Sequence, residues 1–372
     1  MRKTLLITLE FPPFAGGVGY YYFNLVKRLP NEKICVLTNE TKTLAENINF
    51  KIYRQVLLTK LPIWPKWLFA LFKIATLVKK EGVELIWVGQ VLPIGTMALI
   101  LKKFLKLDYL VSCHGTDILT AQKKQRKREL LIKILREAKI ITANSKYTQQ
   151  EIVKLGISPE KIIIIYPCAN DLPPIDPIKK DKLLTNYNLK NKKILLSVGR
   201  LVPRKGFITI INIFPELLNI FPNLIYLIIG QGRLKEKLEQ QISSLNLNNA
   251  IKILDNISNE DLSYFYDLAD IFILTPINLA TEVEGWGMVF LEASLFAKPI
   301  IASATGGIPE AVLANKTGIL INPENPQEIT QAIIKLLTDK NFANFLGETA
   351  KKYVLTNFRW SKEVNKLLNI LK

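Results

Sequence analysis

Histidine and cysteine are scarce in this chain of 372 residues, which contains one histidine, His114, and three cysteines. Cys35, Cys113 and Cys168 are far apart, form no CxxC pair and stand among apolar residues. Zinc sites in proteins draw most of their ligands from clustered His and Cys, so the sequence predicts no metal site. We expect the three cysteines to be buried free thiols, as in proteins of a reducing cytosol.

Long hydrophobic runs are absent as well. No apolar stretch approaches the roughly 18–20 residues that a membrane-spanning helix requires. Near the N-terminus the apolar run Leu5–Leu9 ends at Glu10, which is too short for the core of a signal peptide. The sequence therefore predicts a cytoplasmic protein, at most peripheral at the cytoplasmic face of a membrane. Its length and a hydrophobic content of 49% favour two globular domains.

Negative charge is under-represented: Lys and Arg total 50 against 32 for Asp and Glu, a net charge of +18. Residues 1–185 carry 30 basic and 15 acidic side chains, whereas residues 186–372 carry 20 and 17. Such an excess indicates an anionic partner, which is nucleic acid, an acidic membrane surface or a phosphorylated substrate. No helix-turn-helix, RRM or zinc-finger pattern accompanies the charge, so no nucleic-acid partner is expected.

Short β-branched runs alternate with longer helical stretches, which predicts βαβ units and parallel sheets. The strands predicted in the first half are Thr4–Leu9, Ile34–Thr38, Leu85–Val88, Tyr109–Cys113, Ile140–Ala143 and Ile162–Tyr166. The helices predicted between them are Tyr20–Leu29, Lys66–Lys80, Gly95–Leu105, Lys124–Ala138 and Lys146–Leu155.

Residues 171–191 interrupt this alternation of predicted strands and helices. They contain Pro173, Pro174 and Pro177 and no apolar periodicity, which predicts a linker. A second series of predicted strands follows: Lys193–Val198, Leu224–Ile229, Ile251–Leu254, Ile271–Thr275, Pro299–Ala302 and Gly318–Ile321. The sequence thus predicts an N-terminal domain over residues 1–170 and a second over residues 192–355, both doubly wound α/β. Ligands of such sheets bind beyond the carboxyl ends of the strands, so the loops there are the candidate sites.

The loop after the first strand contains the adjacent Gly16 and Gly17 directly before a helix. Glycine lets a ligand approach the backbone closely, and a helix N-terminus offers N–H groups to a phosphate or hydroxyl. An ordinary strand–helix turn is the alternative. Neither G-x-G-x-x-G nor a Walker A sequence is present here, which argues against a dehydrogenase or a P-loop NTPase.

His114 stands at the end of a predicted strand in the sequence HGTD, where active-site groups collect in α/β folds. A hydrogen-bonded structural histidine is the alternative. In the second domain Arg200 and Lys205 lie in the loop GRLVPRKG before the predicted helix Phe207–Leu218. Two cations beside a helix N-terminus suit a diphosphate, and solvated loop charges are the alternative. The role of Arg204 stays ambiguous.

Glu284 and Glu292 are eight residues apart and would lie about 80° out of register on one continuous helix. Gly285 and Gly287 predict instead that Glu284 belongs to a loop over the start of a helix that carries Glu292. N–H groups at Met288–Phe290 would then be available to phosphate oxygens. Two carboxylates beside a cationic loop suit the hydroxyl groups of a sugar and a ribose, because carboxylates are strong acceptors.

Taken together, these loops resemble those of the retaining glycosyltransferases of family 4, which have the GT-B fold. The resemblance runs nearly end to end and includes the family's mannosyltransferases of the phosphatidylinositol mannoside type. Among these motifs only the E-x7-E block, two glutamates separated by seven residues, is a specific sign of the family by itself. The whole set in this order is a very specific sign of it. The motifs are FPPFAGG (11–17), HG (114–115), ANSKYT (143–148), GRLVPRKG (199–206), EGWGMVFLEASLFAKPIIASATGGIPEAV (284–312), NPENPQEI (322–329) and FRWSK (358–362). The asparagine-glycine loop common in the family appears here without glycine, as residues 166–171.

The resemblance implies two Rossmann-like domains that face each other across a cleft, with a final helix at about 356–372 packed back on the first. It implies transfer of a hexose, with mannose favoured, from a nucleotide-diphosphate sugar such as GDP-mannose or a UDP-sugar. The acceptor would be a hydroxyl of a lipid-linked or glycan molecule, and neither a metal nor a cofactor would be needed. The implied catalytic residues are His114, Arg200, Lys205 and Glu284. The implied donor-binding residues are Gly16, Gly17, Gly199, Arg200, Lys205, Glu284, Gly287, Met288, Val289, Phe290 and Glu292.

The acceptor side is indicated by charge and aromatic residues. Lys66, Lys73 and Lys80 recur every seven residues among Trp64, Trp67, Phe69 and Phe72. This pattern fits a helix lying on an anionic bilayer and equally a helix packed on its own sheet. The basic run 123–128 fits the same anionic bilayer, and a solvated helix face is the alternative. The rival functions are an epimerase or a glycan phosphorylase of the same fold, and a non-catalytic sugar-nucleotide binding protein.

Overall fold

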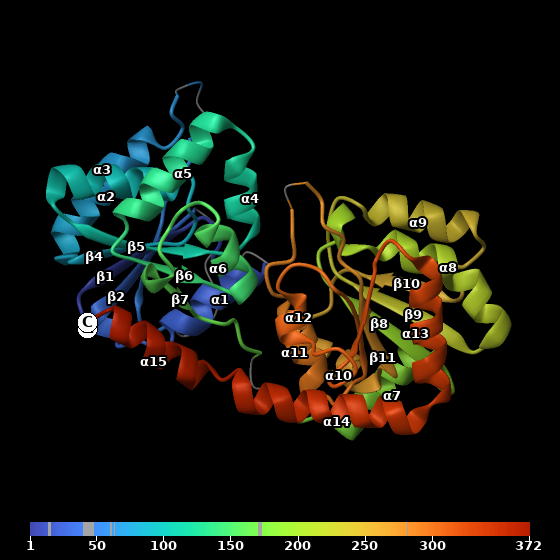
Figure 1. Cartoon of the computed structure of the whole chain (residues 1–372). Helices are drawn as coiled ribbons and strands as arrows, with labels where there is room; N and C mark the ends of the chain where they lie inside the picture. The colour runs from blue at the N-terminus through green and yellow to red at the C-terminus, as the bar shows by residue number, and fades with distance from the viewer. Residues whose placement is uncertain (14–15, 40–47, 60–61, 63, 170–172, 281) are drawn as a thin grey trace. The chain divides into compact units, whose positions relative to one another are not determined.

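The computed structural model describes residues 1–13, 16–39, 48–59, 62, 64–169, 173–280 and 282–372. The chain forms two compact units (Figure 1). Unit 1 consists of Met1–Cys168, Ala280–Gly285 and Trp360–Lys372, and unit 2 of Ala169–Leu279 and Trp286–Arg359. The chain therefore returns to unit 1 twice, once with a short segment that includes Glu284 and once with its C-terminal helix.

Unit 1 is built on a parallel sheet with the strand order β3-β2-β1-β4-β5-β6-β7. Its central strands are fully buried because helices cover both faces, as in other parallel sheets. The strands are β1 Thr4–Thr8, β2 Ile34–Thr38, β3 Lys51–Arg54, β4 Leu85–Val88, β5 Asp108–Cys113, β6 Ile140–Ala143 and β7 Ile162–Ile164. The helices are α1 Gly17–Val26, α2 Leu68–Glu81, α3 Ile94–Leu105, α4 Thr116–Gln122, α5 Gln125–Glu137, α6 Lys146–Val153 and α15 Trp360–Ile370.

Two elements of unit 1 were not expected from the sequence. Strand β3 lies at the edge of the sheet and its residues are exposed or half-buried, so it lacks the continuous apolar run of the inner strands. Helix α4 begins two residues after His114, within a sequence that we expected to be loop. All six strands predicted in this half are present, to within two residues at their ends.

Unit 2 is built on a second parallel sheet with the order β10-β9-β8-β11-β12-β13. The strands are β8 Lys193–Val198, β9 Leu224–Ile229, β10 Ile251–Leu254, β11 Ile271–Leu274, β12 Ile300–Ser303 and β13 Ile319–Ile321. The helices are α7 Pro177–Asn186, α8 Phe207–Ile220, α9 Lys235–Ser244, α10 Asn259–Leu268, α11 Met288–Leu295, α12 Ile308–Ala311, α13 Pro326–Thr338 and α14 Lys340–Asn357. The prediction of two doubly wound α/β sheets is confirmed.

Helix α7 lies within residues 171–191, which the sequence predicts to be a linker. Asp176 caps this helix by accepting a hydrogen bond from the N–H of Ile178, and Pro177 occupies its first turn. None of its residues is buried, so no apolar periodicity was there to be recognised. Ion pairs attach it to α10: Lys179 with Asp261 at 2.7 Å and Lys180 with Asp267 at 2.6 Å.

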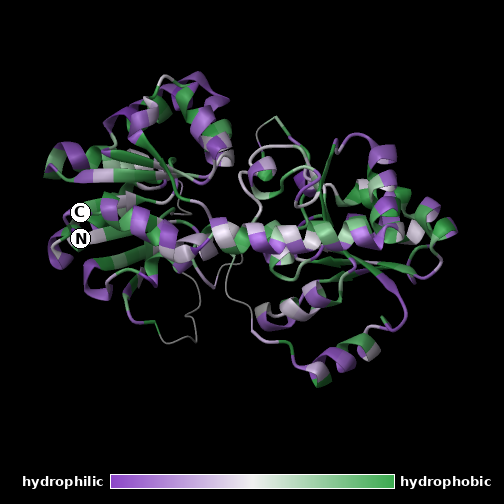
Figure 2. Ribbon diagram, turned by 60° about the horizontal axis from the view of Figure 1, so that its bottom comes forward, coloured by the Kyte–Doolittle hydropathy of each residue, from purple (hydrophilic) through white to green (hydrophobic). Residues whose placement is uncertain are grey.

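In both units the hydrophobic side chains concentrate in the strands and in the inward faces of the helices (Figure 2). Cys35, Cys113 and Cys168 are buried and unpaired, as predicted. No helix among the described residues is long and apolar enough to cross a bilayer.

Helix α15 packs on unit 1 (Figure 1). The carbonyl of Leu371 accepts a hydrogen bond from the N–H of Arg2 at 2.8 Å. The carboxylate of Glu363 is fully buried and accepts hydrogen bonds from the Tyr166 N–H at 2.9 Å and from Lys366 Nζ at 2.8 Å. Lys366 lies on α15 itself, so the ion pair is within the helix, and the hydrogen bond from the Tyr166 N–H attaches Glu363 to the rest of unit 1.

Candidate active site

His114 follows the last residue of β5, and several groups of unit 1 hold it in place. One carboxylate oxygen of Asp117 accepts hydrogen bonds from the N–H groups of His114, at 2.9 Å, and Ile118, at 3.0 Å. Gly115 has φ 92°, a conformation that favours glycine. Burial lowers the pKa of His114 to about 4, so the imidazole is neutral at pH 7.

The His114 side chain contacts the hydroxyl group of Tyr22, which projects from α1. The distance from Tyr22 Oη to His114 Nε2 is 2.6 Å, and the distance from the same oxygen to the carbonyl of Gly89 is 2.5 Å. The rings of Tyr21 and Tyr22 meet the imidazole edge to face, with centroids 5.5 and 5.4 Å away. The ring is therefore held by a hydrogen bond on one nitrogen and by aromatic packing on two sides.

The segment that carries Glu284 lies against the His114 turn within unit 1. Thr116 Oγ1 donates a hydrogen bond to the carbonyl of Val283 at 2.9 Å. A Cβ atom on Gly285 would stand 2.2 Å from the carbonyl oxygen of His114, so no other residue fits there without a shift. The structure thus brings together the backbone of two predicted catalytic residues, His114 and Glu284, that are far apart in the sequence.

Residues of the ANSKYT motif support this turn. Asn144 Nδ2 contacts the carbonyl of His114 at 3.4 Å, and Asn144 Oδ1 accepts a hydrogen bond from Thr148 Oγ1 at 2.7 Å. Ser145 caps α6 by accepting a hydrogen bond from the Thr148 N–H. The motif therefore has a local structural task, which is to orient an asparagine toward the turn of His114.

Gly16 and Gly17 lie at the start of α1, as predicted. Gly16 is the N-cap residue in an extended conformation, and Gly17 is the first residue of the helix. No side chain caps this helix end, and no acidic residue lies in its first turn. A helix start of this kind has N–H groups without intrahelical acceptors, which suits an anion or a hydroxyl.

In unit 2 the loop from Gly199 to Gly206 follows β8 and leads into α8. Arg200 is exposed, whereas Arg204 and Lys205 retain 9% and 6% of their accessible surface. The Lys205 ammonium lies over Gly199: a Cβ atom there would be 3.7 Å from Nζ. Gly206 has φ 76°, and its Cβ would be 2.1 Å from the carbonyl oxygen of Thr275, so this position accepts only glycine.

Gly230 and Gly232 are two residues of this site that the sequence analysis missed. A Cβ atom on Gly230 would stand 1.9 Å from the Gly199 carbonyl, and one on Gly232 would stand 2.5 Å from that of Leu201. The Leu201 N–H donates to the Gln231 carbonyl at 2.8 Å, which joins the loops after β8 and β9. The signal was present, because the sequence Gly-Gln-Gly follows strand β9 directly.

The separation of Glu284 from Glu292 by a loop–helix junction is confirmed, because α11 begins at Met288 after Gly287, whose φ is 89°. Of the N–H groups that we expected to face phosphate, that of Phe290 donates to the Gly287 carbonyl at 3.1 Å. The donor-binding roles of Met288, Val289 and Phe290 stay predictions.

Glu292 lies on α11 and its carboxylate accepts a hydrogen bond from the buried Tyr266 hydroxyl at 2.6 Å. Burial raises the pKa of the Glu292 carboxyl above its usual value, and the hydrogen bond from Tyr266 lowers it. Tyr266 is itself stacked on Phe296, with ring centroids 5.8 Å apart. The carboxylate is thus oriented by a rigid aromatic neighbour.

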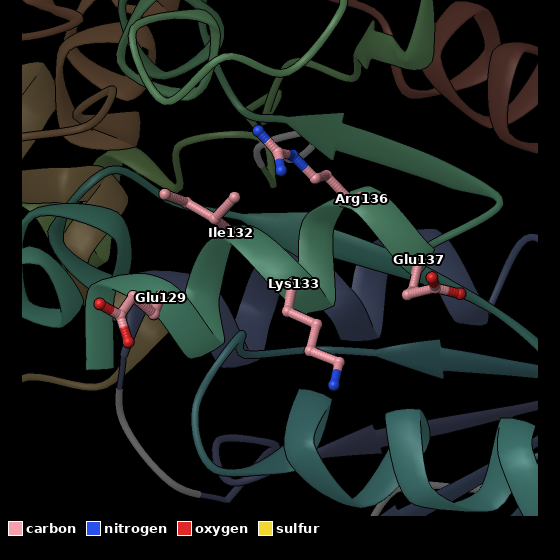
Figure 3. A pocket seen from close by; sticks show the side chains of 5 residues that line it. All are labelled: Glu129, Ile132, Lys133, Arg136 and Glu137. Carbon is pink, nitrogen blue, oxygen red and sulfur yellow. The ribbon is translucent and has the colours of Figure 1, made fainter. Parts of the chain in front are cut away.

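A surface hollow of about 340 Å³ lies elsewhere, along α5 (Figure 3). It is lined by Glu129, Ile132, Lys133, Arg136 and Glu137. Lys133 and Arg136 point away from each other, so no set of groups converges on one spot. None of these residues is a predicted site residue. Within the described parts of the chain, no three His, Cys, Asp or Glu side chains gather into a candidate metal site.

Two family models together match most of the chain. Residues 15–171 match the model described as Glycosyltransferase Family 4, and residues 179–353 match the model described as Glycosyl transferases group 1. The chain is 25% identical to a GDP-mannose-dependent alpha-(1-6)-phosphatidylinositol monomannoside mannosyltransferase of Mycobacterium tuberculosis, covering 100% of this chain and 98% of that protein. The enzyme of the same description from Mycolicibacterium smegmatis is 27% identical, covering 99% and 97%.

Solved structures share the fold. Anabaena HepE in complex with UDP-glucose superposes with a TM-score of 0.85 at 21% identity, covering 100% of this chain and 99% of that chain. Sucrose-phosphate synthase from Thermosynechococcus elongatus superposes with a TM-score of 0.82 at 20% identity, covering 100% and 98%. At these identities the likeness shows the architecture of two Rossmann-like domains.

Proposed function

This chain belongs to the family 4 glycosyltransferases of the GT-B fold, and we propose that it transfers mannose from GDP-mannose to a hydroxyl group of a lipid-linked acceptor with retention of configuration. Similarity over nearly the whole chain to two GDP-mannose-dependent mannosyltransferases carries this proposal. A UDP-sugar donor and a glycan acceptor are the alternatives within the same family.

The donor diphosphate would bind at the loop 199–206 of unit 2. Sugar transfer builds negative charge on the leaving diphosphate and positive charge on the sugar ring. Lys205 is held against Gly199 and is therefore preorganised, while the exposed Arg200 is free to close on a phosphate from solvent. With the N–H groups of Met288 and Val289, these cations supply the stabilisation that a metal ion supplies elsewhere, so we propose transfer without a metal or cofactor.

The sugar and the ribose would bind through carboxylates. In this proposal Glu284 accepts hydrogen bonds from hydroxyls of the donor sugar, Glu292 from the ribose, and His114 lies near the reacting carbon. The Tyr266 hydrogen bond orients Glu292 for this task. Gly16 and Gly17 would contact the donor phosphate and the acceptor through the start of α1.

The acceptor would be reached at an anionic membrane on the cytoplasmic side. Helix α2 buries Ala70, Ile74, Leu77 and Val78 on unit 1. On the outer surface of α2, Phe69 and Lys73 are exposed and the relative exposure of Phe72 is 66%. Trp64, which precedes the helix, is 88% exposed. Aromatic side chains beside lysines are the composition with which a helix lies in an anionic bilayer surface.

The donor is tested by thermal denaturation with GDP-, UDP- and ADP-sugars, because a ligand that binds the native state raises its apparent stability. We expect GDP-mannose to give the largest shift, and a larger shift with a UDP-sugar would overturn the donor assignment. Transfer of labelled mannose to a lipid extract, with and without EDTA, then tests the reaction. An epimerase would convert the donor without an acceptor, a phosphorylase would require phosphate, and a binding protein would show no turnover.

Membrane docking is tested by co-sedimentation with vesicles of phosphatidylcholine alone and with phosphatidylglycerol added. We expect binding to the anionic vesicles only, weakened in Phe72→Ser. Phe345→Ser is the matched control, because Phe345 is 54% exposed and lies on α14 of unit 2. Equal binding to both kinds of vesicle would remove the electrostatic part of this proposal.

A further inference from the structure

The hydroxyl group of Tyr22 contacts the Gly89 carbonyl and His114 Nε2 and also lies near the Ser112 hydroxyl, whose hydrogen bond acts to lower the pKa of Tyr22. The two measured contacts determine where its single hydrogen lies. Gly89 contributes a carbonyl oxygen, which accepts hydrogen bonds and never donates them. At an oxygen–oxygen distance of 2.5 Å, Tyr22 must therefore donate to Gly89. The other neighbour, His114 Nε2 at 2.6 Å, then faces lone pairs of the Tyr22 oxygen.

This arrangement selects one tautomer of His114. An Nε2 atom without hydrogen would place a lone pair against the lone pairs of Tyr22, so Nε2 carries the hydrogen and donates it. The chain of hydrogen bonds runs from His114 Nε2 to Tyr22 Oη to the Gly89 carbonyl. Because the neutral imidazole has one N–H group, Nδ1 is left with a lone pair and can act only as an acceptor.

Nδ1 is available for a ligand. Among the described residues the ring contact with a printed distance is that of Nε2 with Tyr22. The other recorded partner of His114 is the Gly89 carbonyl, which itself contacts the Tyr22 hydroxyl, and His114 as a residue is half-buried. The ring itself is fixed by the edges of Tyr21 and Tyr22, and Tyr22 in turn packs on Trp87 with ring centroids 5.6 Å apart. The direction of the Nδ1 lone pair is thus set by α1 and the sheet, before any substrate arrives.

We propose that Tyr22 is a positioning residue that holds His114 as the Nε2–H tautomer, so that Nδ1 accepts a hydrogen bond from a hydroxyl group of the transferred sugar. This inference rests on the proposed function for the nature of the ligand. The Tyr22–His114 assignment itself does not depend on which sugar is transferred. It also gives α1 a second task besides the contacts of Gly16 and Gly17.

His114 is the only histidine of the chain, so labelling with ¹⁵N-histidine gives one pair of ring nitrogen signals. In the full-length protein at pH 7 without substrate, we expect a protonated, pyrrole-type Nε2 and an unprotonated, pyridine-type Nδ1. In Tyr22→Phe we expect both signals to move and an Nδ1–H form to appear. A protonated Nδ1 in the unmodified protein, or unchanged signals in Tyr22→Phe, would overturn the assignment.

Tyr21→Phe is the matched control, because its ring also packs on His114 while its hydroxyl contacts the Ile165 carbonyl at 3.3 Å. We expect Tyr21→Phe to keep the nitrogen signals of the unmodified protein. Tyr22→Phe should lower kcat about tenfold with little change in the KM of the donor, as when an interaction made mainly in the transition state is lost. In a His114→Ala background, Tyr22→Phe should cause no further loss, and an additive loss would show that Tyr22 acts by another route.

Addition of GDP-mannose or UDP-glucose separates the two proposals. Movement of the Nδ1 signal by either donor supports the sugar contact. A donor that stabilises the protein and leaves Nδ1 unmoved overturns the sugar contact alone. If neither donor changes the melting temperature, the proposed function fails, whatever tautomer is observed.

Discussion

In unit 1 the loop that carries His114 is held by polar side chains in addition to the close approach of Gly285, whereas in unit 2 the loop that carries Arg200 and Lys205 is held mainly by the close approach of glycines. Asp117, Thr116 and Asn144 supply hydrogen bonds to the first loop. Gly206 and Gly230 let backbone approach backbone around the second. A loop held by hydrogen bonds weakens gradually when one is removed, but a loop held by close approach tolerates no added atom.

The largest effect is expected from Gly206→Ala. The new Cβ would meet the backbone of Thr275 at 2.1 Å in a conformation with positive φ, so the loop must move. We expect the free energy of unfolding to fall by at least about 2 kcal/mol and donor binding to be lost. Chemical denaturation and donor titration measure both effects.

Gly82→Ala is the matched control for this variant. Gly82 also has positive φ, 63°, but nothing lies within 4 Å of its added Cβ. We expect a cost of about 1 kcal/mol and normal donor binding. Equal effects of the two substitutions would show that close approach around Gly206 is unimportant.

Removal of a charged side chain from the loop of either unit should have the next largest effect. Lys205→Ala and Glu284→Ala are each expected to lower turnover at least about 10²-fold, since each would remove a contact to the donor in the proposed function. Lys237→Ala, at an exposed position of α9, is the control for loss of a lysine. Near-normal transfer in both variants would refute the site assignment.

The lowered pKa of His114 predicts a dependence of stability on pH. The pKa of His114 is about 4 in the folded protein against 6.5 for the ordinary group, so its contribution is present above pH 6.5 and is lost as the pH falls toward 4. Burial raises the pKa of the Asp117 carboxyl to about 6, which opposes this loss below pH 6. The effect of His114 alone must therefore be read as a difference between variants.

We expect His114→Gln to become more stable relative to the unmodified protein by about 3 kcal/mol between pH 7 and pH 4. Urea denaturation at a series of pH values measures the difference. If the free energies of unfolding of the two proteins changed in parallel with pH, His114 would have an ordinary pKa in the folded state.

The smallest effect is expected from Thr116→Val, which keeps the size of the side chain and removes its hydrogen bond to Val283. We expect a loss of about 1 kcal/mol in stability and of about tenfold in kcat, because the segment with Glu284 becomes less well positioned. Thr76→Val is the control, since the Thr76 hydroxyl contacts only the Phe72 carbonyl of its own helix. If Thr116→Val lowered the free energy of unfolding as much as Gly206→Ala does, the proposed difference between the two loops would be refuted.

Local sequence patterns predicted most of the strands and part of the candidate site. Runs such as Ile34–Thr38 and Lys193–Val198 become strands because their apolar residues are buried on both faces. The glycines around Glu284 correctly predicted a loop before the helix of Glu292. The edge strand β3 and helix α7 escaped recognition because neither has the burial that creates an apolar pattern.

By itself the sequence determined most of the order of strands and helices along the chain and the membership of family 4, because these depend on local patterns and short motifs. The tertiary structure decided that Tyr22 meets His114, that residues 280–285 belong to unit 1, and that Lys205 is buried while Arg200 is exposed. These contacts join residues that only the order of strands in the sheets and the path of the loops bring together. Local periodicity reports burial, and it carries no information about which distant side chain fills the remaining hydrogen bond.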